Sequence, residues 1–310
     1  MSIYQRIGWR LLAGIVVLWG AVSLSFIGLH FASGDPALVI LGGPEALPTP
    51  EVLARVREQY GLDQPLWVQY GHYLSRLLVG DLGESYRLQI PVTQAIATQL
   101  GATLQLALAA AVLALLLAIS VALLTARRGR WLSASVSGVE LVLSSTPIFV
   151  LSMLLLLLFS FTLHWLPPTG SGGWRNLILP SLTLALPVAA LLIQVLRQEL
   201  DDILEQPFIT MARARGLSEA GVRVGHALRH ALIPLLTLAG FIFASLLAGS
   251  VVVETLFSRQ GIGRLLLDAV TNKDVPMVLG ITLLAALSYV LINLLVDLLL
   301  PWIDPRVQGQ

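Results

Sequence analysis

The residues best placed to perform chemistry are two histidines, His226 and His230, which stand four positions apart in a charged segment. On a helix this spacing puts both imidazoles on one face, as in many histidine pairs that bind zinc. The zinc-hydrolase pattern His-Glu-x-x-His also needs a glutamate between them, whereas Ala227, Leu228 and Arg229 occupy these positions. The arginine would repel a cation. The pair therefore predicts a helix face that contacts a partner or lipid, and no metal site.

Other catalytic patterns are also excluded. The chain has no cysteine, which removes thiolate metal sites and cysteine nucleophiles. Lys273, the single lysine, is not part of a Gly-Lys-Ser/Thr sequence, so this chain holds no P-loop for ATP. Asp35 and Asp81 stand beside glycines and read as turn residues rather than a catalytic pair. A net charge of +1 gives no sign of nucleic-acid binding.

Ionisable groups inside apolar segments are functional candidates, because a charge left in hydrocarbon costs about 3 kcal/mol or more. Glu140 and Glu254 are the acidic candidates. Ser144, in the same apolar segment as Glu140, and Gln194, in the following one, are uncharged polar residues that could also line a path. Glu254 also has a second interpretation, in which its carboxylate fixes the loop that follows it. Asp297 stands close to Pro301, which favours a structural role at the membrane interface.

The composition indicates that these polar groups belong to a membrane protein. Of 310 residues, 56% are hydrophobic and 12% are charged, about half the charged fraction of a soluble protein. We predict an all-α, polytopic membrane protein with six transmembrane helices, because each apolar run is long enough to cross the hydrocarbon core. The predicted spans are 11–29, 102–125, 135–161 with a kink at Thr146-Pro147, 177–196, 231–253 and 277–300.

One long polar region interrupts the apolar pattern after the first span. We divide the chain into the N-terminus and first span (1–31), an external helical region (32–100), a five-helix core (101–303) and a tail (304–310). Within the external region, Thr49-Pro50 predicts the start of a helix that ends near Gly61. A second helix is predicted from Pro65 to Val79.

Arginines set the predicted orientation, because short loops rich in basic residues stay in the cytoplasm. Both termini are therefore predicted to be cytoplasmic. The basic residues assigned to the inner side are Arg6, Arg10, Arg127, Arg128, Arg130, Arg197, Arg213, Arg215, Arg223, Arg229 and Arg306.

The core contains one long charged loop, 198–230, and the overlapping stretch 206–237 predicts a hairpin of two short helices. Pro207 suits the first turn of a helix, and Gly216 suits the left-handed position that closes one. Ser218 then caps the second helix, with Leu217 and Val222 spaced as a hydrophobic staple. Small residues keep the hairpin slim enough for close approach by another protein. The alternative is an amphipathic hairpin that rests on anionic lipid through its arginines.

The wording of this hairpin, TMARARGLSE followed by HALRHALIP, resembles the cytoplasmic loop of ABC-importer permeases. The family pattern is Glu-Ala-Ala, three residues, then Gly; here Thr210-Met211-Ala212 and Gly216 occupy those places. Two further features resemble the dipeptide, oligopeptide and nickel branch of this family. One is the longer distance from Gly216 to Pro234, and the other is the pair of external sequences YGLDQPLWVQYGHYL and GDLGESY. In the external segment after the fifth predicted span, members of this family usually have Trp-Pro before a glycine, whereas this chain has Arg259-Gln260 at these two positions.

The resemblance implies a type I ABC importer permease without catalytic residues or a bound cofactor. Its implied partners are a second homologous permease, two ATP-binding subunits that carry ATP and Mg²⁺, an external solute-binding protein and the bilayer of a bacterial inner membrane. The implied ATPase-coupling residues are Thr210, Met211, Ala212, Arg213, Ala214, Arg215, Gly216 and Leu217.

In such a permease, Glu254, Glu140, Gln194 and Ser144 become candidates for the translocation path. The cargo stays open among peptides, glutathione, nickel and metal chelates. The alternative function is an ATP-independent secondary transporter or channel. Secondary transporters are typically built from inverted repeats and hold an ion site in mid-membrane.

Overall fold

The computed structural model describes residues 3–32, 35–42 and 47–303, and within them the secondary structure is helical, with one isolated bridge between Glu84 and Pro91. The predicted tail 304–310 lies outside the described residues, as does the segment 43–46. The chain divides into two compact units. The first unit comprises residues 1–101 and 261–290, and the second comprises residues 102–260 and 291–310.

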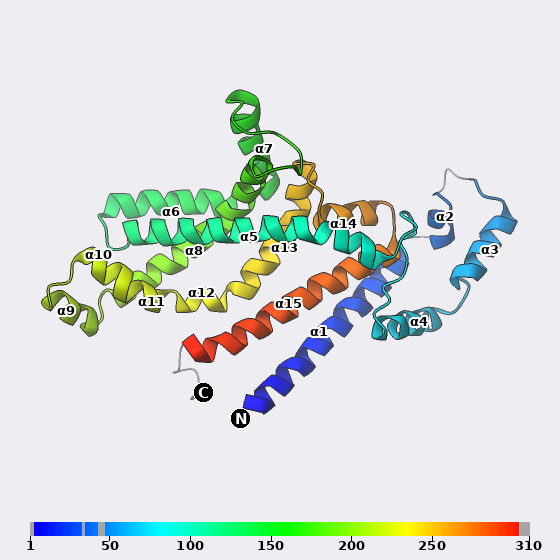
Figure 1. Cartoon of the computed structure of the whole chain (residues 1–310), viewed down its shortest axis with the longest axis horizontal. Helices are drawn as coiled ribbons and strands as arrows, with labels where there is room; N and C mark the ends of the chain where they lie inside the picture. The colour runs from blue at the N-terminus through cyan, green and yellow to red at the C-terminus, as the bar shows by residue number, and fades with distance from the viewer. Residues whose placement is uncertain (1–2, 33–34, 43–46, 304–310) are drawn as a thin grey trace. The chain divides into compact units, whose positions relative to one another are not determined.

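The first unit contains the N-terminal span and the polar region predicted to be external. Its helices are α1 (Ile3–Ala32), α2 (Pro36–Ile40), α3 (Pro50–Tyr60), α4 (Leu66–Leu78), α14 (Ile262–Thr271), the start of α5 (Val92–Thr125) and most of α15 (Val275–Ile303) (Figure 1). Both helices predicted in the polar region are confirmed. Thr49 precedes α3 with Pro50 at its first position, and Gly61 ends it in the left-handed conformation at φ 65°.

A buried aspartate, Asp274, organises the loops of the first unit. Its carboxylate accepts hydrogen bonds from the Ser85 hydroxyl and from the backbone N–H groups of Tyr86 at 3.1 Å and Arg87 at 3.3 Å. It therefore fixes the turn before α5 to the start of α15. Sequence reasoning missed this residue, because it stands in a polar loop beside Lys273.

Asp35 and Asp81 are turn residues, as predicted. Asp35 caps α2 by accepting from the Ala37 N–H at 3.0 Å and pairs with Arg57 at 2.6 Å. Asp81 accepts from Arg76 at 2.7 Å and from the Gly83 N–H at 2.9 Å. The Arg76 hydrogen bond, aided by that of Gly83, lowers the pKa of the Asp81 carboxyl.

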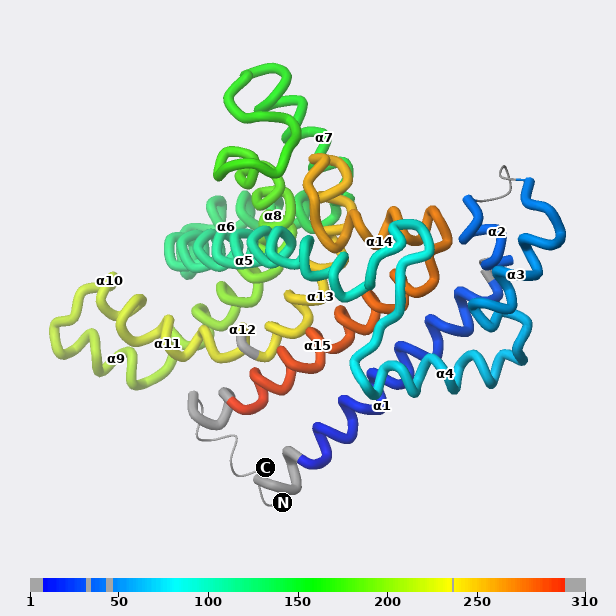
Figure 2. Tube along the Cα trace, turned by 45° about the vertical axis from the view of Figure 1, so that its right-hand side comes forward, coloured from blue at the N-terminus to red at the C-terminus, as the bar shows by residue number. Residues whose placement is uncertain are grey.

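The second unit is built around α5 and α8 (Arg175–Ile203), with α6 (Arg130–Ser145) packed against α8 (Figures 1 and 2). Alanines at four-residue spacing allow close packing of helices along α5. These alanines are Ala110, Ala114, Ala118 and Ala122, and all are fully buried. The remaining elements are α7 (Ile148–Leu155), the π-helix Leu156–Thr162, α9 (Pro207–Ala214), α10 (Glu219–Val222), the π-helix Arg223–Ala227, α11 (Leu228–Ala231), α12 (Ile233–Thr237) and α13 (Ala239–Leu256).

Five helices in the described part of the chain are long and apolar enough to cross a membrane, or up to six if the bent pair α6 and α7 forms one span. The predicted kink at Thr146-Pro147 is a break of 107°. Thr146 is extended at φ −78° and ψ 122°, because a residue before proline avoids the helical region. The predicted fifth span also starts late: helix α13 begins at Ala239 rather than at Ala231.

Candidate functional site

The charged segment folds into the predicted two-helix hairpin. Pro207 occupies the first position of α9, and Gly216 follows that helix at φ 83°. Ser218 caps α10, its hydroxyl accepting from the Gly221 N–H at 3.2 Å. Val222 is fully buried, whereas 42% of Leu217 is exposed. Local capping preferences alone therefore account for the shape of the hairpin.

The hairpin buries one face and exposes the other. Of the eight residues predicted to contact an ATPase, Ala212 is buried and the other seven are exposed. Two of the exposed residues are apolar and large: Met211 is 60% exposed and Leu217 is 42% exposed. Phe208, also 42% exposed, packs its ring 5.4 Å from that of His230. Apolar side chains exposed among arginines are typical of a protein-docking surface.

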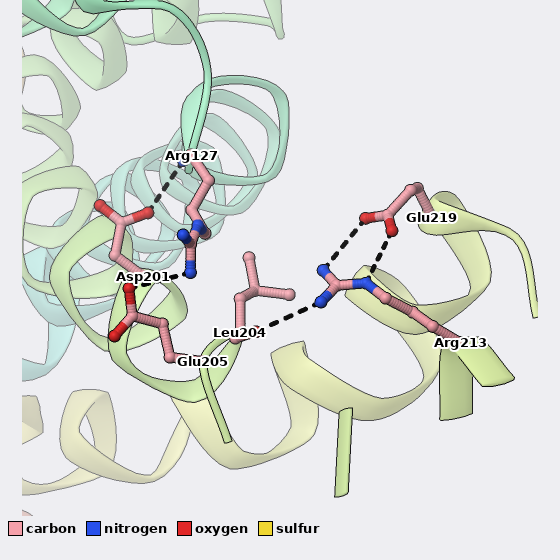
Figure 3. Close-up of polar contacts among 6 residues, drawn as sticks. All are labelled: Arg127, Asp201, Leu204, Glu205, Arg213 and Glu219. Atoms are coloured by element: carbon pink, nitrogen blue, oxygen red, sulfur yellow. Dashed lines mark hydrogen bonds and ion pairs between the residues drawn. The ribbon is translucent and has the colours of Figure 1, made fainter. Parts of the chain in front are cut away.

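Polar contacts fasten the hairpin to the membrane helices (Figure 3). Arg213 donates to Glu219 at 2.7 Å and to the Leu204 carbonyl at 3.5 Å, which joins α9 to α10 and to the end of α8. The Arg213 hydrogen bond lowers the pKa of Glu219. A lowered pKa means that this contact stabilises the hairpin at neutral pH and is lost as the pH falls through that pKa.

Two further arginines act nearby: Arg127 joins the end of α5 to the end of α8, and Arg223 joins the hairpin itself to the end of α5. Arg127 bonds through its backbone N–H to Asp201 at 2.9 Å and through its guanidinium to Glu205 at 3.0 Å (Figure 3). Arg223 donates to the carbonyls of Leu123 and Ala126, both at 2.9 Å, and so caps the end of α5. A force on the hairpin would therefore reach α5 and α8 directly. Sequence reasoning counted these arginines only as markers of the inner side.

The structure brings three predicted polar residues together in one cleft. Glu140 and Ser144 on α6 and Gln194 on α8 line a cavity of about 620 Å³, with Arg197, Asp201 and Asp202 further along α8. Arg197 pairs with Glu140 at 3.0 Å and donates to Ser133 at 2.6 Å. Both members of the pair have side chains that are 10% exposed. The cleft therefore places charged and polar side chains between two apolar spanning helices.

Glu254 lies apart from this cleft. It is fully buried in α13 and accepts from the Thr103 hydroxyl at 2.7 Å. Arg259, 1% exposed, donates to Gln105 at 2.9 Å and to the Ala102 carbonyl at 3.3 Å, and burial lowers its pKa. Together these contacts tie the loop after α13 to α5, which supports the interpretation of Glu254 as a loop-fixing residue. Arg259, which stands where the family usually has the tryptophan of Trp-Pro, is thus a buried member of the contacts between this loop and α5.

Fold and site define a class: a polytopic helical protein of the membrane whose spanning helices carry a fastened, surface-exposed hairpin. Residues 114–309 match the model of the binding-protein-dependent transport system inner membrane component, and residues 4–107 match that of its N-terminal component. The chain is 41% identical over 305 residues to the glutathione transport system permease protein GsiC of Salmonella typhimurium (strain LT2), covering 96% of this chain and 97% of that one. The same protein of Escherichia coli (strain K12) is also 41% identical, with the same coverage.

The chain belongs to the family of binding-protein-dependent transport system inner membrane components. It is a multi-pass permease subunit of an ABC importer in the inner membrane. Its role is not catalytic, because ATP is hydrolysed by separate subunits of such a system. Membership also implies ATPase and substrate-binding partners.

Proposed function

We propose that this permease carries small peptide-like solutes, glutathione among them, inward through a path that it forms with a second homologous permease. The naming of its relatives as glutathione permeases supports a peptide-like cargo before nickel or a metal chelate. An external solute-binding protein delivers the solute, and two ATPase subunits that hold ATP and Mg²⁺ drive the cycle. The chain itself binds no cofactor.

The observation that carries this proposal is the attachment of the hairpin to α5 and α8. Its exposed face, residues 210–217 without Ala212, docks on an ATPase. Closure of the ATPases on ATP displaces the hairpin, and the contacts of Arg213 and Arg223 pass the movement to α8 and α5, whose ends Arg127 joins to each other. Two states of the bundle, biased by ATP at one end and by the loaded binding protein at the other, then open the cleft alternately.

Reconstitution tests the proposal. Proteoliposomes that contain both permeases, both ATPases and the binding protein are expected to accumulate radiolabelled glutathione only when ATP is present on the ATPase side. Liposomes that lack the ATPases should show no uptake above the lipid background. Movement of glutathione through the permeases alone would contradict the proposal and establish a channel or secondary transporter.

The proposed orientation places the α3 side outside the cell and the hairpin inside. The natural chain has no cysteine, so single cysteines report on each side without background. Thr49→Cys and Arg215→Cys both replace exposed residues. A membrane-impermeant maleimide is expected to label Thr49→Cys in spheroplasts and to label Arg215→Cys only after permeabilisation. The reverse labelling pattern would show that the chain has the opposite orientation in the membrane.

A further inference from the structure

Helix α4 has an apolar side and a polar side. At about 100° of rotation per residue, Trp67, Leu74 and Leu78 fall within an arc of about 40°, and we call them the apolar stripe. Gln69 and Arg76 fall on the opposite side of the helix. Trp67 is 75% exposed and Leu78 is 89% exposed, so the described part of the chain leaves most of the apolar stripe uncovered.

The polar side of α4 is bound to the polar region of the first unit. Gln69 donates hydrogen bonds to the carbonyls of Leu62 at 3.1 Å and Gln64 at 2.8 Å, in the segment that precedes the helix. Arg76 donates to Asp81 at 2.7 Å, so the segment that leaves the helix turns to the polar side as well. Both connections of α4 are therefore held on its polar side, and the apolar stripe faces away from them.

Contacts with α1 set the level of α4 in the membrane, and both helices belong to the first unit (Figures 1 and 2). The hydroxyls of Tyr70 and Ser23 share a hydrogen bond of 2.5 Å. The ring of Phe26 lies 5.3 Å from that of Tyr70 and 5.9 Å from that of Tyr73. In the predicted span 11–29, Ser23 and Phe26 stand six and three positions before the end, about 9 Å and 5 Å inside the apolar run. Helices that lie in the membrane interface bury their apolar face to a depth of about 5–10 Å, which is the same level.

The surface of α1 at this level is apolar and exposed. Leu24 is 74% exposed and Ile27 is 51% exposed. Only 11% of the apolar window of α1 is buried within the described chain, which is typical of a spanning helix that lipid surrounds. The apolar stripe lies beside this end of α1, and its opposite side is held by polar loops. Lipid is therefore the occupant that fits the stripe.

We propose that α4 is an interfacial helix, and that its apolar stripe inserts into the lipid leaflet at the C-terminal end of α1. Trp67 suits the boundary between headgroups and acyl chains, where tryptophan is enriched. Asp81, the partner of Arg76, also accepts from the Gly83 N–H at 2.9 Å, and the Gly83 carbonyl accepts from the N–H of Val92 at 2.9 Å. The inserted helix thereby holds the start of α5 at a fixed height in the membrane.

Spin labels test the proposal on the assembled transporter in nanodiscs. The natural chain has no cysteine, so Trp67→Cys and Leu78→Cys each place one label on the apolar stripe, and both replace exposed side chains. The partner subunits are used in cysteine-free form. Collisions of the label with oxygen, which dissolves in lipid, and with chromium oxalate, which stays in water, are measured by electron paramagnetic resonance. We expect both stripe labels to collide often with oxygen and to lose access to chromium oxalate.

His72→Cys is the matched control, because His72 is exposed and lies on the polar side of the same helix. Its label should collide freely with chromium oxalate. Equal access of chromium oxalate to the stripe labels and to the His72→Cys label would overturn the proposal, because water would then cover the stripe. Stripe labels that neither reagent reaches would overturn it too, because a protein partner would then cover the stripe instead of lipid.

Discussion

Glutamate in place of Gly216 is expected to abolish uptake while the permease still inserts and folds. An added Cβ at Gly216 meets no atom within 4 Å, so the new side chain extends outward from the hairpin without a clash inside the chain. The left-handed backbone, at φ 83°, adds about 1–2 kcal/mol of strain. The larger effect is expected in the docked state, where the carboxylate replaces a surface that the ATPase approaches closely. A hot spot of about 2 kcal/mol lowers ATPase association roughly 30-fold, which co-purification and binding titration would measure.

Gly80→Glu supplies the matched control for backbone strain. Gly80 also has a left-handed φ of 78°, and an added Cβ there also meets nothing within 4 Å. The two substitutions therefore introduce the same charge and nearly the same strain, one on the hairpin and one after α4. Uptake by Gly80→Glu should remain near that of the natural protein. An equal loss of uptake in both variants would contradict the docking role of the hairpin. So would a Gly216→Glu variant that keeps full uptake and full ATPase association.

The hairpin was predictable from sequence because local preferences decide its shape. Pro207, Gly216 and Ser218 each fix one backbone position, and none of them needs a distant partner to do so. The same holds for α3, which Pro50 starts and Gly61 ends. The spanning helices were predictable from hydropathy, and the kink at Thr146-Pro147 from the proline, whereas the helix ends and the 107° size of the break were not.

The contacts that give these elements a function were not predictable in the same way. Arg223 reaches carbonyls about a hundred positions earlier in the chain, and Asp274 binds a turn nearly 190 positions earlier. A single sequence contains no signal for such partners. Glu140 and Arg197 did carry a signal, because each is an ionisable residue within or beside an apolar run, and two such residues are expected to pair. The sequence suggested Glu140 alone, since Arg197 had already been assigned as an inner-side charge.

Removal of one member of the Glu140–Arg197 pair is expected to destabilise the permease strongly. Glu140→Ala would leave the Arg197 guanidinium buried, with two serine hydroxyls as its remaining partners. The loss of one partner from a buried ion pair costs about 3–5 kcal/mol. The apparent melting temperature of the purified protein should fall clearly. The surface pair of Arg76 and Asp81, with side chains about half exposed, is a suitable comparison, and Asp81→Ala should change stability little.

The double variant Glu140→Met, Arg197→Met separates stability from transport. Apolar side chains of similar volume often replace a buried ion pair without loss of stability, so the melting temperature should return to that of the natural protein. If the solute passes through the cleft between α6 and α8, the double variant still removes the charged side chains that the solute would meet. Uptake should then stay at least about 10-fold below that of the natural protein. ATPase association should be unchanged, because the double variant leaves the docking face of the hairpin intact. Full recovery of uptake in the double variant would show that the pair only holds α6 against α8, and that the solute passes elsewhere.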